Sequence, residues 1–143
     1  MAANSLLASS VQALCVIAWR GAKGADATLL ATSLNTNPVV VRRILKVLER
    51  QGLVRLRPGR HGGVELSRSP GDITLDQVYR AIEPEGALFA MRVRRNLGCP
   101  VQKVMTRTLP SLFLAADEAV IGVLRSTSIA TLAKQVRSRT DDG

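Results

Sequence analysis

The chain has 143 residues, of which 46% are hydrophobic, so it can bury a core and is expected to form one domain, or one domain with an appendage. Its net charge is +9, and residues 1–68 alone hold 10 basic and 3 acidic side chains. Clustered cations attract phosphate, so this half favours a polyanionic partner; the alternative is a merely soluble basic surface. Two cysteines are too few for a disulfide framework and fit a reducing cytoplasm.

The first apolar stretch predicts an amphipathic helix that ends near Gly21. On that helix Cys15 is expected to be a small buried hydrophobe. No positive charge precedes the stretch and polar residues interrupt it, so we expect neither a signal peptide nor a membrane span. Its apolar positions recur at steps of three and four: Leu7, Val11, Leu14, Cys15 and Ala18.

Two further short helices are predicted, joined by the polar turn NTN. Asp26 is a candidate N-cap for a helix that runs through Leu34. Asn37 is the candidate N-cap of the next helix, which has Pro38 in its first turn and Gly52 just past its end. The arrangement resembles a helix-turn-helix, whose last helix enters the DNA major groove. That last helix has an apolar face and basic side chains that project elsewhere: Val41, Ile44, Leu45 and Leu48 against Arg42, Arg43, Lys46 and Arg50.

A β-hairpin is predicted directly after the third helix, because LVRLR and GVEL alternate apolar and polar residues. Helices followed by a hairpin make a winged helix. The glycines of the loop, Gly62 among them, permit a close approach to a groove. Arg57 and Arg60 are candidates for phosphate contacts or for a narrow minor groove. His61, the single histidine, is expected at the wing tip, since no second histidine or close acidic cluster supports a metal or catalytic site.

One more short helix completes the predicted DNA-binding domain. Thr74 and Gln77 have the spacing of a capping box, Leu75, Val78, Tyr79 and Ile82 share one face, and Pro84 ends the helix. We therefore expect a winged helix-turn-helix over residues 1–82 and a connector over residues 83–99.

A long helix is predicted from Pro100 to Ser126, because its apolar positions step by three and four over about 40 Å. Pro110 is expected to kink or split it. The helix is apolar on more than one face, which favours an isologous homodimer; the alternative is that both faces are covered within the monomer. The predicted dimerisation positions are Val101, Met105, Leu112, Ala116, Val120 and Val123.

A last short helix is predicted after Ser128, its candidate N-cap. Its inward positions are Ile129, Leu132 and Val136. Residues 100–137 are thus expected to be dimerisation helices, and residues 138–143 a flexible tail. The predicted fold class is mainly α, with a two-stranded wing and a long C-terminal dimerisation helix.

The chain resembles the Rrf-type bacterial winged-helix regulators from about Ser5 to Val136. The resemblance is carried by VQALCVIA, VVRRILKVLERQGLV, GRHGGVELSR, ITLDQVYRAIE, CPV and TSIATLA. This family includes the repressor of iron-sulfur cluster assembly, the nitric-oxide-sensing repressor and the repressor of cysteine metabolism. The resemblance implies a homodimer built on the long helix and a role in controlling transcription.

The resemblance also implies roles for single residues. The start of the third helix matches the part of the family's recognition helix that reads base edges, and the wing matches the part that approaches the minor groove. Thr28, early in the second helix, is a candidate phosphate contact. The expected DNA-binding residues are Thr28, Asn37, Val39, Arg42, Arg43, Lys46, Arg57, Arg60, His61 and Gly62.

The cluster-binding members of the family place three cysteines before the long helix, whereas residues 85–103 contain only Cys99. One thiolate cannot replace three, so we expect no iron-sulfur cluster and no other cofactor. Cys99 precedes a helix N-terminus and follows Arg92, Arg94 and Arg95, which makes it a candidate redox sensor. The alternative is an unreactive, partly buried residue.

The sequence therefore predicts a cytoplasmic, sequence-specific, homodimeric DNA-binding regulator, a repressor that occupies an inverted-repeat operator and responds to a thiol oxidant or a small molecule. The alternative is a winged-helix protein-interaction module, which would tolerate loss of Arg42, Arg43 and Arg60. A thiol enzyme is disfavoured, because the single histidine lies in the predicted wing and no base is paired with a nucleophile.

Overall fold

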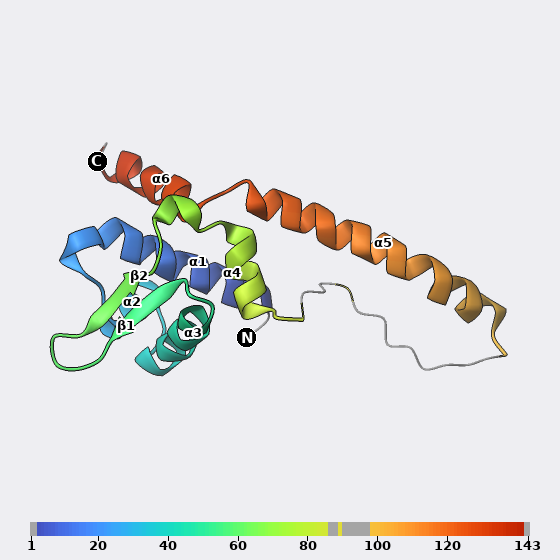
Figure 1. The fold of residues 1–143 in the computed structure, drawn as a ribbon, viewed down its shortest axis with the longest axis horizontal. Coiled ribbons are helices and arrows are strands. Elements are labelled where there is room, and N and C mark those ends of the chain that lie inside the picture. Colours follow the sequence, from blue (N-terminus) through green and yellow to red (C-terminus); the bar gives the residue numbers. More distant parts are fainter. Residues whose placement is uncertain (1–2, 86–88, 90–97, 142–143) are drawn as a thin grey trace.

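The structure is a computed structural model that describes residues 3–85, 89 and 98–141. An N-terminal part of short helices and a hairpin is followed by one long helix that extends away from it (Figure 1). The predicted mainly α, winged helix-turn-helix fold is confirmed. In chain order the elements are α1 (Ala3–Arg20), a 3-10 turn (Gly21–Lys23), α2 (Ala27–Ser33), α3 (Pro38–Arg50), β1 (Val54–Arg57), β2 (Gly63–Leu66), a second 3-10 turn (Pro70–Asp72), α4 (Leu75–Ile82), α5 (Pro100–Arg125) and α6 (Ile129–Asp141).

The helix starts follow the caps that the sequence predicts. Asp26 Oδ1 accepts a hydrogen bond from the Leu29 backbone N–H at 2.8 Å, and Asn37 Oδ1 accepts one from Val40 N–H at 3.1 Å. Gly52 follows α3 with a φ of +69°, a left-handed conformation that suits glycine. These local bonds fix where the helix-turn-helix begins and ends.

The core of the N-terminal part lies between α1, α2, α3 and the hairpin, where Leu14, Leu30 and Leu48 are fully buried. The segment Ser5–Lys23 is long and apolar enough to cross a membrane, by length and composition only. Within this segment Ala13, Leu14 and Ile17 are buried in the core, and Leu7 and Val11 pack against it partly buried.

The wing is a two-stranded antiparallel sheet whose register runs from Val54 opposite Leu66 to Arg57 opposite Gly63. A further pairing, which the sequence did not predict, attaches it to the loop before α2. There Val64 N–H donates to the Ala25 carbonyl oxygen at 2.9 Å. The wing is therefore fixed to the helix-turn-helix on its inner edge.

The segment that leads into α4 also holds the junction between α5 and α6. Thr74 N–H donates to Gln77 Oε1 at 3.4 Å, as the predicted capping box requires. Leu75 N–H donates to the Thr127 carbonyl at 3.0 Å, and Ile129 N–H donates to that of Ile73 at 2.8 Å. Ile129 is fully buried, so α6 packs on the N-terminal part beside α1 (Figure 1).

The structure corrects three expectations for the C-terminal half. Pro110 does not split the long helix, because proline removes a single N–H and regular turns continue on both sides of it. Val136, which was expected to face inward, is 40% exposed, and the buried residue on this part of α6 is Ala133. The tail expected over 138–143 is helical as far as Asp141, since no residue before that point breaks a helix.

Most of the predicted connector, residues 86–88 and 90–97, lies outside the described residues, together with Arg92, Arg94 and Arg95. Within that segment the described residue is Phe89, whose ring stacks on Phe113 of α5 with the ring centroids 5.6 Å apart.

Candidate nucleic-acid interface

Helix α3 has a buried apolar face and an exposed basic face. Val41, Ile44, Leu45 and Leu48 are buried in the core, as the spacing predicts. Arg42, Arg43 and Lys46 are exposed, and Val39 is 56% exposed at the start of the helix. Because the buried face anchors α3, the exposed face is held rigidly toward the solvent.

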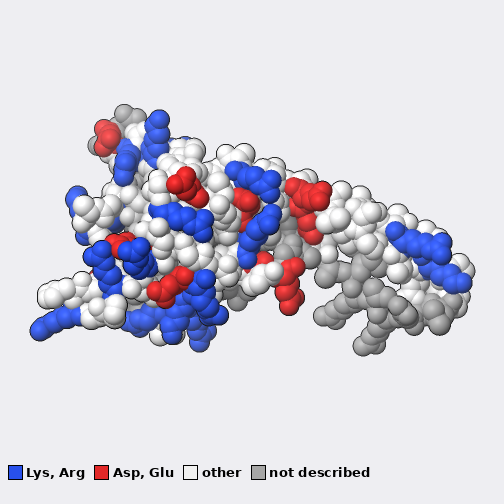
Figure 2. Space-filling view, viewed as in Figure 1, with Lys and Arg blue, Asp and Glu red and all other residues white. Residues whose placement is uncertain are grey.

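Basic side chains gather at one end of the molecule. Figure 2 shows a dense group of Lys and Arg at the end formed by α3 and the hairpin, while other basic side chains and the acidic ones are scattered over the rest of this face. We call the set on α3 and the hairpin the basic face; its exposed members are Arg42, Arg43, Lys46, Arg50, Arg55, Arg57 and Arg60. A face of this kind attracts a polyanion.

Two arginines of the wing share a carboxylate that the sequence analysis did not single out. Arg57 Nη2 lies 2.7 Å from Glu65 Oε2, and Arg55 Nη1 lies 3.3 Å from Glu65 Oε1. The strand register places Arg55 opposite Glu65, which is the signal that could have revealed the pair. Glu65 thus reduces the charge that Arg57 can offer to a phosphate.

The wing tip itself depends on glycine. A Cβ added at Gly62 would collide with the carbonyl oxygen of Arg57 and come within 2.9 Å of that of Gly59. Gly62 N–H donates to the Gly59 carbonyl at 3.0 Å, and Gly59 has a φ of +101°. This tight turn exposes Arg60 and His61.

The remaining predicted DNA-binding residues lie at the starts of α2 and α3. Thr28 is exposed in the first turn of α2, where backbone N–H groups point outward. The Oδ1 of Asn37 is occupied by the capping bond to Val40 N–H. Asn37 therefore has a structural role at the start of α3, independent of the DNA contact predicted for it.

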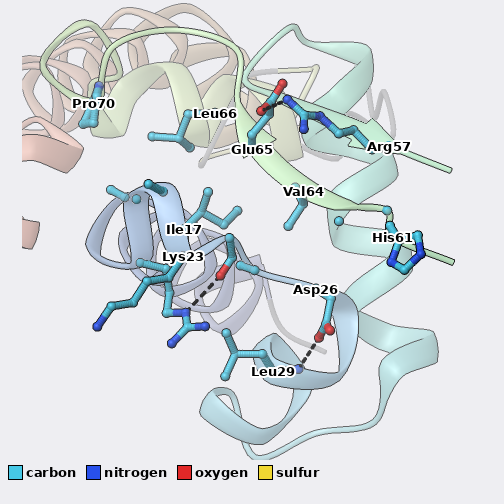
Figure 3. A pocket seen from close by; sticks show the side chains of 18 residues that line it. Ile17, Lys23, Asp26, Leu29, Arg57, His61, Val64, Glu65, Leu66 and Pro70 are labelled. Atoms are coloured by element: carbon cyan, nitrogen blue, oxygen red, sulfur yellow. Dashed lines mark hydrogen bonds and ion pairs between the residues drawn. The ribbon is translucent and has the colours of Figure 1, made fainter. Parts of the chain in front are cut away.

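A hollow of about 850 Å³ lies behind the wing, between β2, the end of α1 and the start of α2 (Figure 3). Its polar groups largely bind one another. Arg20 Nε donates to the Gly24 carbonyl at 2.9 Å, Asp26 caps α2, and Arg57 pairs with Glu65. These contacts support the wing and leave no paired base and nucleophile there.

The two cysteines differ in position. Cys15 is half-buried in α1, and burial raises the pKa of its thiol to about 11, so it stays protonated at neutral pH. Cys99 is half-buried at the N-cap of α5. In the described ranges, no three His, Cys, Asp or Glu side chains gather as a metal ion would require.

The long helix carries an exposed stripe. In the part of the chain that the structure describes, no residue of α5 is buried, so the alternative in which the monomer covers both apolar faces is wrong for these residues. Of the predicted dimerisation positions, Val101, Leu112 and Val123 are 59–70% exposed and Met105 is 36% exposed. Ala116 and Val120 are half-buried on another side of the helix.

Seven exposed positions of α5, from Val101 to Gly122, recur at alternating steps of four and three, which is the spacing of a coiled-coil seam. A Cβ added at Gly122 would meet nothing within 4 Å, so the packing of the described chain does not require a glycine there. The seam consists of Val101, Met105, Thr108, Leu112, Ala115, Ala119 and Gly122.

Comparison with known proteins agrees with this geometry. The model of the Rrf2 family, described as iron-dependent transcriptional regulators, matches residues 4–135. YwnA of Bacillus subtilis (strain 168), assigned as an HTH-type transcriptional regulator, is 35% identical over 126 residues, which are 88% of this chain and 92% of YwnA.

Solved structures show the same fold. A crystal structure assigned to a DNA-binding protein is 30% identical, with a TM-score of 0.69 over 89% of this chain and 97% of that one. CymR, the global cysteine regulator of B. subtilis, is 21% identical, with a TM-score of 0.68 over 91% of this chain and 94% of CymR. The family description names iron, whereas the described residues of this chain bring together no group of three His, Cys, Asp or Glu side chains that could hold a metal ion.

Proposed function

Because the chain belongs to the Rrf2 family of transcriptional regulators, we propose that it is a cytoplasmic homodimeric repressor that binds an inverted-repeat operator. The observation that carries this proposal is the basic face. It joins a rigidly anchored helix to a glycine-rich wing tip, and both present cations to the solvent. A helix of this kind fits the major groove, and the wing fits the adjacent minor groove.

The proposed DNA contacts are of three kinds: to base edges, to phosphate oxygens and to the minor groove. Arg42 and Arg43 can each bind guanine in bidentate fashion, which discriminates against a wrong base by about 1–3 kcal/mol. Lys46 and Thr28 suit phosphate oxygens, which fix the register on DNA. Arg60 at the wing tip suits a narrow minor groove, where the negative potential is strongest. Arg57 has a lesser part, since Glu65 already binds it.

The exposed seam of α5 favours a second copy of the chain as its partner. A two-fold axis through Leu112, perpendicular to the helix, brings the two copies together in antiparallel orientation. Large side chains of the N-terminal half then meet small ones of the other copy. The pairs are Val101 with Gly122, Met105 with Ala119, Thr108 with Ala115 and Leu112 with its own copy.

A parallel pairing fits less well. It would oppose Val101 to Val101 at one end and Gly122 to Gly122 at the other, so the gap between the helices would be uneven. Close, even packing gives most of the contact energy at such a seam. We therefore favour the antiparallel dimer, in which the two copies of α3 are related by the same two-fold axis.

Cys99 is the candidate sensor of the signal that releases DNA. Cys99 lies half-buried at the start of α5, next to the seam, so oxidation there would change the packing of the dimer. Fast alkylation of the native protein at neutral pH, lost in Cys99→Ser, supports a sensing thiol. Slow alkylation contradicts it.

Selection from a pool of genomic fragments tests the function. Purified native protein at near-physiological salt is expected to enrich an inverted repeat, and the Arg42→Ala/Arg60→Ala variant is expected to lose it. Enrichment that survives in the variant would contradict the assigned contacts. If neither protein enriches a sequence, a winged-helix module that binds another protein becomes the better interpretation.

A further inference from the structure

Val39 is an exposed apolar side chain among the cations of α3. The residue is 56% exposed, and in the described chain no other large hydrophobic residue of α3 or the hairpin is exposed. Arg42 and Arg43 follow it by about one turn of the helix and Lys46 by about two, and all three are exposed. Residues three, four and seven positions apart share one side of a helix, so Val39 lies on the same side as these cations.

The packing of the chain does not explain a valine at this position. The next two residues turn toward the core: Val40 packs against it partly buried, and Val41 is fully buried. Val39 does not belong to this core, and valine is a poorer helix former than alanine. Single exposed hydrophobic residues are common on protein surfaces. The indication of a role is therefore the position of Val39, in the first turn of a cationic helix.

The chemistry of the DNA major groove offers such a side chain one partner. The base edges there present hydrogen-bond donors and acceptors, and one methyl group, on C5 of thymine. Valine can neither donate nor accept a hydrogen bond, so it would displace water from a polar base atom without replacing the bond. Against the thymine methyl it loses no hydrogen bond and buries apolar surface.

The shape of valine also suits a contact of this kind. Its branched Cβ leaves one strongly preferred rotamer in a helix, so Val39 loses little freedom when it contacts a base. The buried residues on the opposite side of α3 hold the backbone that carries it. The methyl groups of Val39 are thus presented to the groove in a fixed position.

We infer that Val39 reads a thymine methyl in each half-site of the operator. This inference rests on the function proposed above and adds the identity of a base. Along the helix axis Val39 lies about 4.5–6 Å from Arg42 and Arg43, at about 1.5 Å per residue. Successive base pairs are about 3.4 Å apart. The thymine therefore lies one or two base pairs from the guanine that either arginine binds.

Anisotropy titrations of the full chain with the selected operator test the inference. Each symmetric pair of thymines is replaced in turn by deoxyuridine, which lacks the C5 methyl but pairs with adenine in the same way. We expect one pair to weaken binding by about fifteenfold, because a buried methyl contributes about fourfold at each of two half-sites.

Val39→Ala shows whether Val39 is the residue that reads the methyl. In this variant the loss caused by deoxyuridine is expected to fall below about twofold, since the side chain that contacts the methyl is truncated. Circular dichroism should show an intact helix content, because alanine favours a helix. Val136→Ala, which truncates an exposed valine of α6, is the matched control and should keep the full loss.

Two outcomes overturn this inference alone. One is a bound operator in which no thymine pair is sensitive to loss of the methyl. The other is an equal loss in native protein and Val39→Ala, which would assign the methyl to another residue. A chain that selects no operator contradicts the proposed function, and this inference with it.

Discussion

Asp76 shows how a single residue ties the DNA-binding part to the long helix. Its side chain is 9% exposed, accepts a hydrogen bond from the Thr74 hydroxyl and pairs with Arg125 of α5. Burial by itself raises the pKa of Asp76, but the Thr74 hydroxyl and the Arg125 guanidinium outweigh it and hold the pKa below its ordinary value. The ionised form is therefore favoured by folding, and this stability is lost as the pH falls through the folded-state pKa.

Arg125→Ala is expected to lower the free energy of unfolding by about 1–2 kcal/mol at pH 7, because it leaves a buried carboxylate without its cation. We keep the figure small since the Arg125 side chain is 63% exposed and solvent screens the pair. Urea unfolding followed by circular dichroism gives the value. The difference should shrink below pH 3.8, the ordinary pKa of aspartate, as Asp76 becomes protonated in both proteins.

Arg107→Ala on the same helix is the matched control, and it should change the stability by less than about 0.5 kcal/mol. Equal losses in the two variants, or a difference that persists in acid, would contradict the assigned role of the Asp76–Arg125 pair.

The wing tip gives a second prediction at this scale. Gly62→Ala forces a methyl group against the Arg57 carbonyl and is expected to distort the tip and weaken operator binding by about tenfold, with little change in the core. Fluorescence anisotropy with labelled operator DNA measures the loss. Gly71→Ala, where an added Cβ meets nothing within 4 Å, should bind as tightly as the native protein. A tight-binding Gly62→Ala variant would rule out a role for the tip geometry.

Helix α5 shows what an element requires beyond its own sequence. Its periodicity is enough to make it helical through Pro110, but its seam is exposed along its whole length. In the proposed dimer the second copy covers this seam, and the small residues Ala115, Ala119 and Gly122 permit close approach of the two helices.

Gly122→Leu is expected to convert the dimer to a monomer. Leucine is a better helix former than glycine by about 0.8 kcal/mol, and a Cβ added at Gly122 meets nothing within 4 Å. Across the antiparallel seam, however, it would meet Val101 of the other copy. Light scattering coupled to gel filtration reports the mass, and circular dichroism verifies that the helix persists. Arg107→Leu, on α5 but outside the seam, should remain dimeric; a dimeric Gly122→Leu protein would disprove the register.

In the proposed dimer, the whole molecule sets the distance between the two copies of α3. The joint at Ile73, Leu75 and Ile129 attaches the winged helix to α5 and α6 by backbone hydrogen bonds, so a dimer through α5 holds both basic faces at a fixed separation. Two such faces related by a two-fold axis match half-sites one helical turn, or a multiple of it, apart.

Insertion of about five base pairs between the half-sites of the selected operator turns one half-site to the opposite side of the DNA. We expect binding to weaken by roughly a hundredfold, because only one half-site can then be occupied at a time. An electrophoretic mobility shift series with insertions of zero, five and ten base pairs measures this, and the ten-base-pair insertion should restore part of the affinity. Equal affinity for all three would mean that the two faces are not rigidly linked.

The amino-acid sequence by itself determined the features that depend on near neighbours. Asp26 and Asn37 start α2 and α3 through bonds to residues three positions away, and the spacing of apolar residues fixes which side of α3 is buried. For the same reason the exposure of Arg42, Arg43 and Lys46 in the candidate interface could be predicted.

Only the tertiary structure decided the contacts between distant residues. Asp76 meets Arg125 across 49 positions, and Ala25 at the loop before α2 pairs with Val64 of the wing. No local pattern encodes such partners, since each depends on how whole elements pack. The hollow behind the wing likewise exists only after the chain has brought β2 beside the end of α1 and the start of α2.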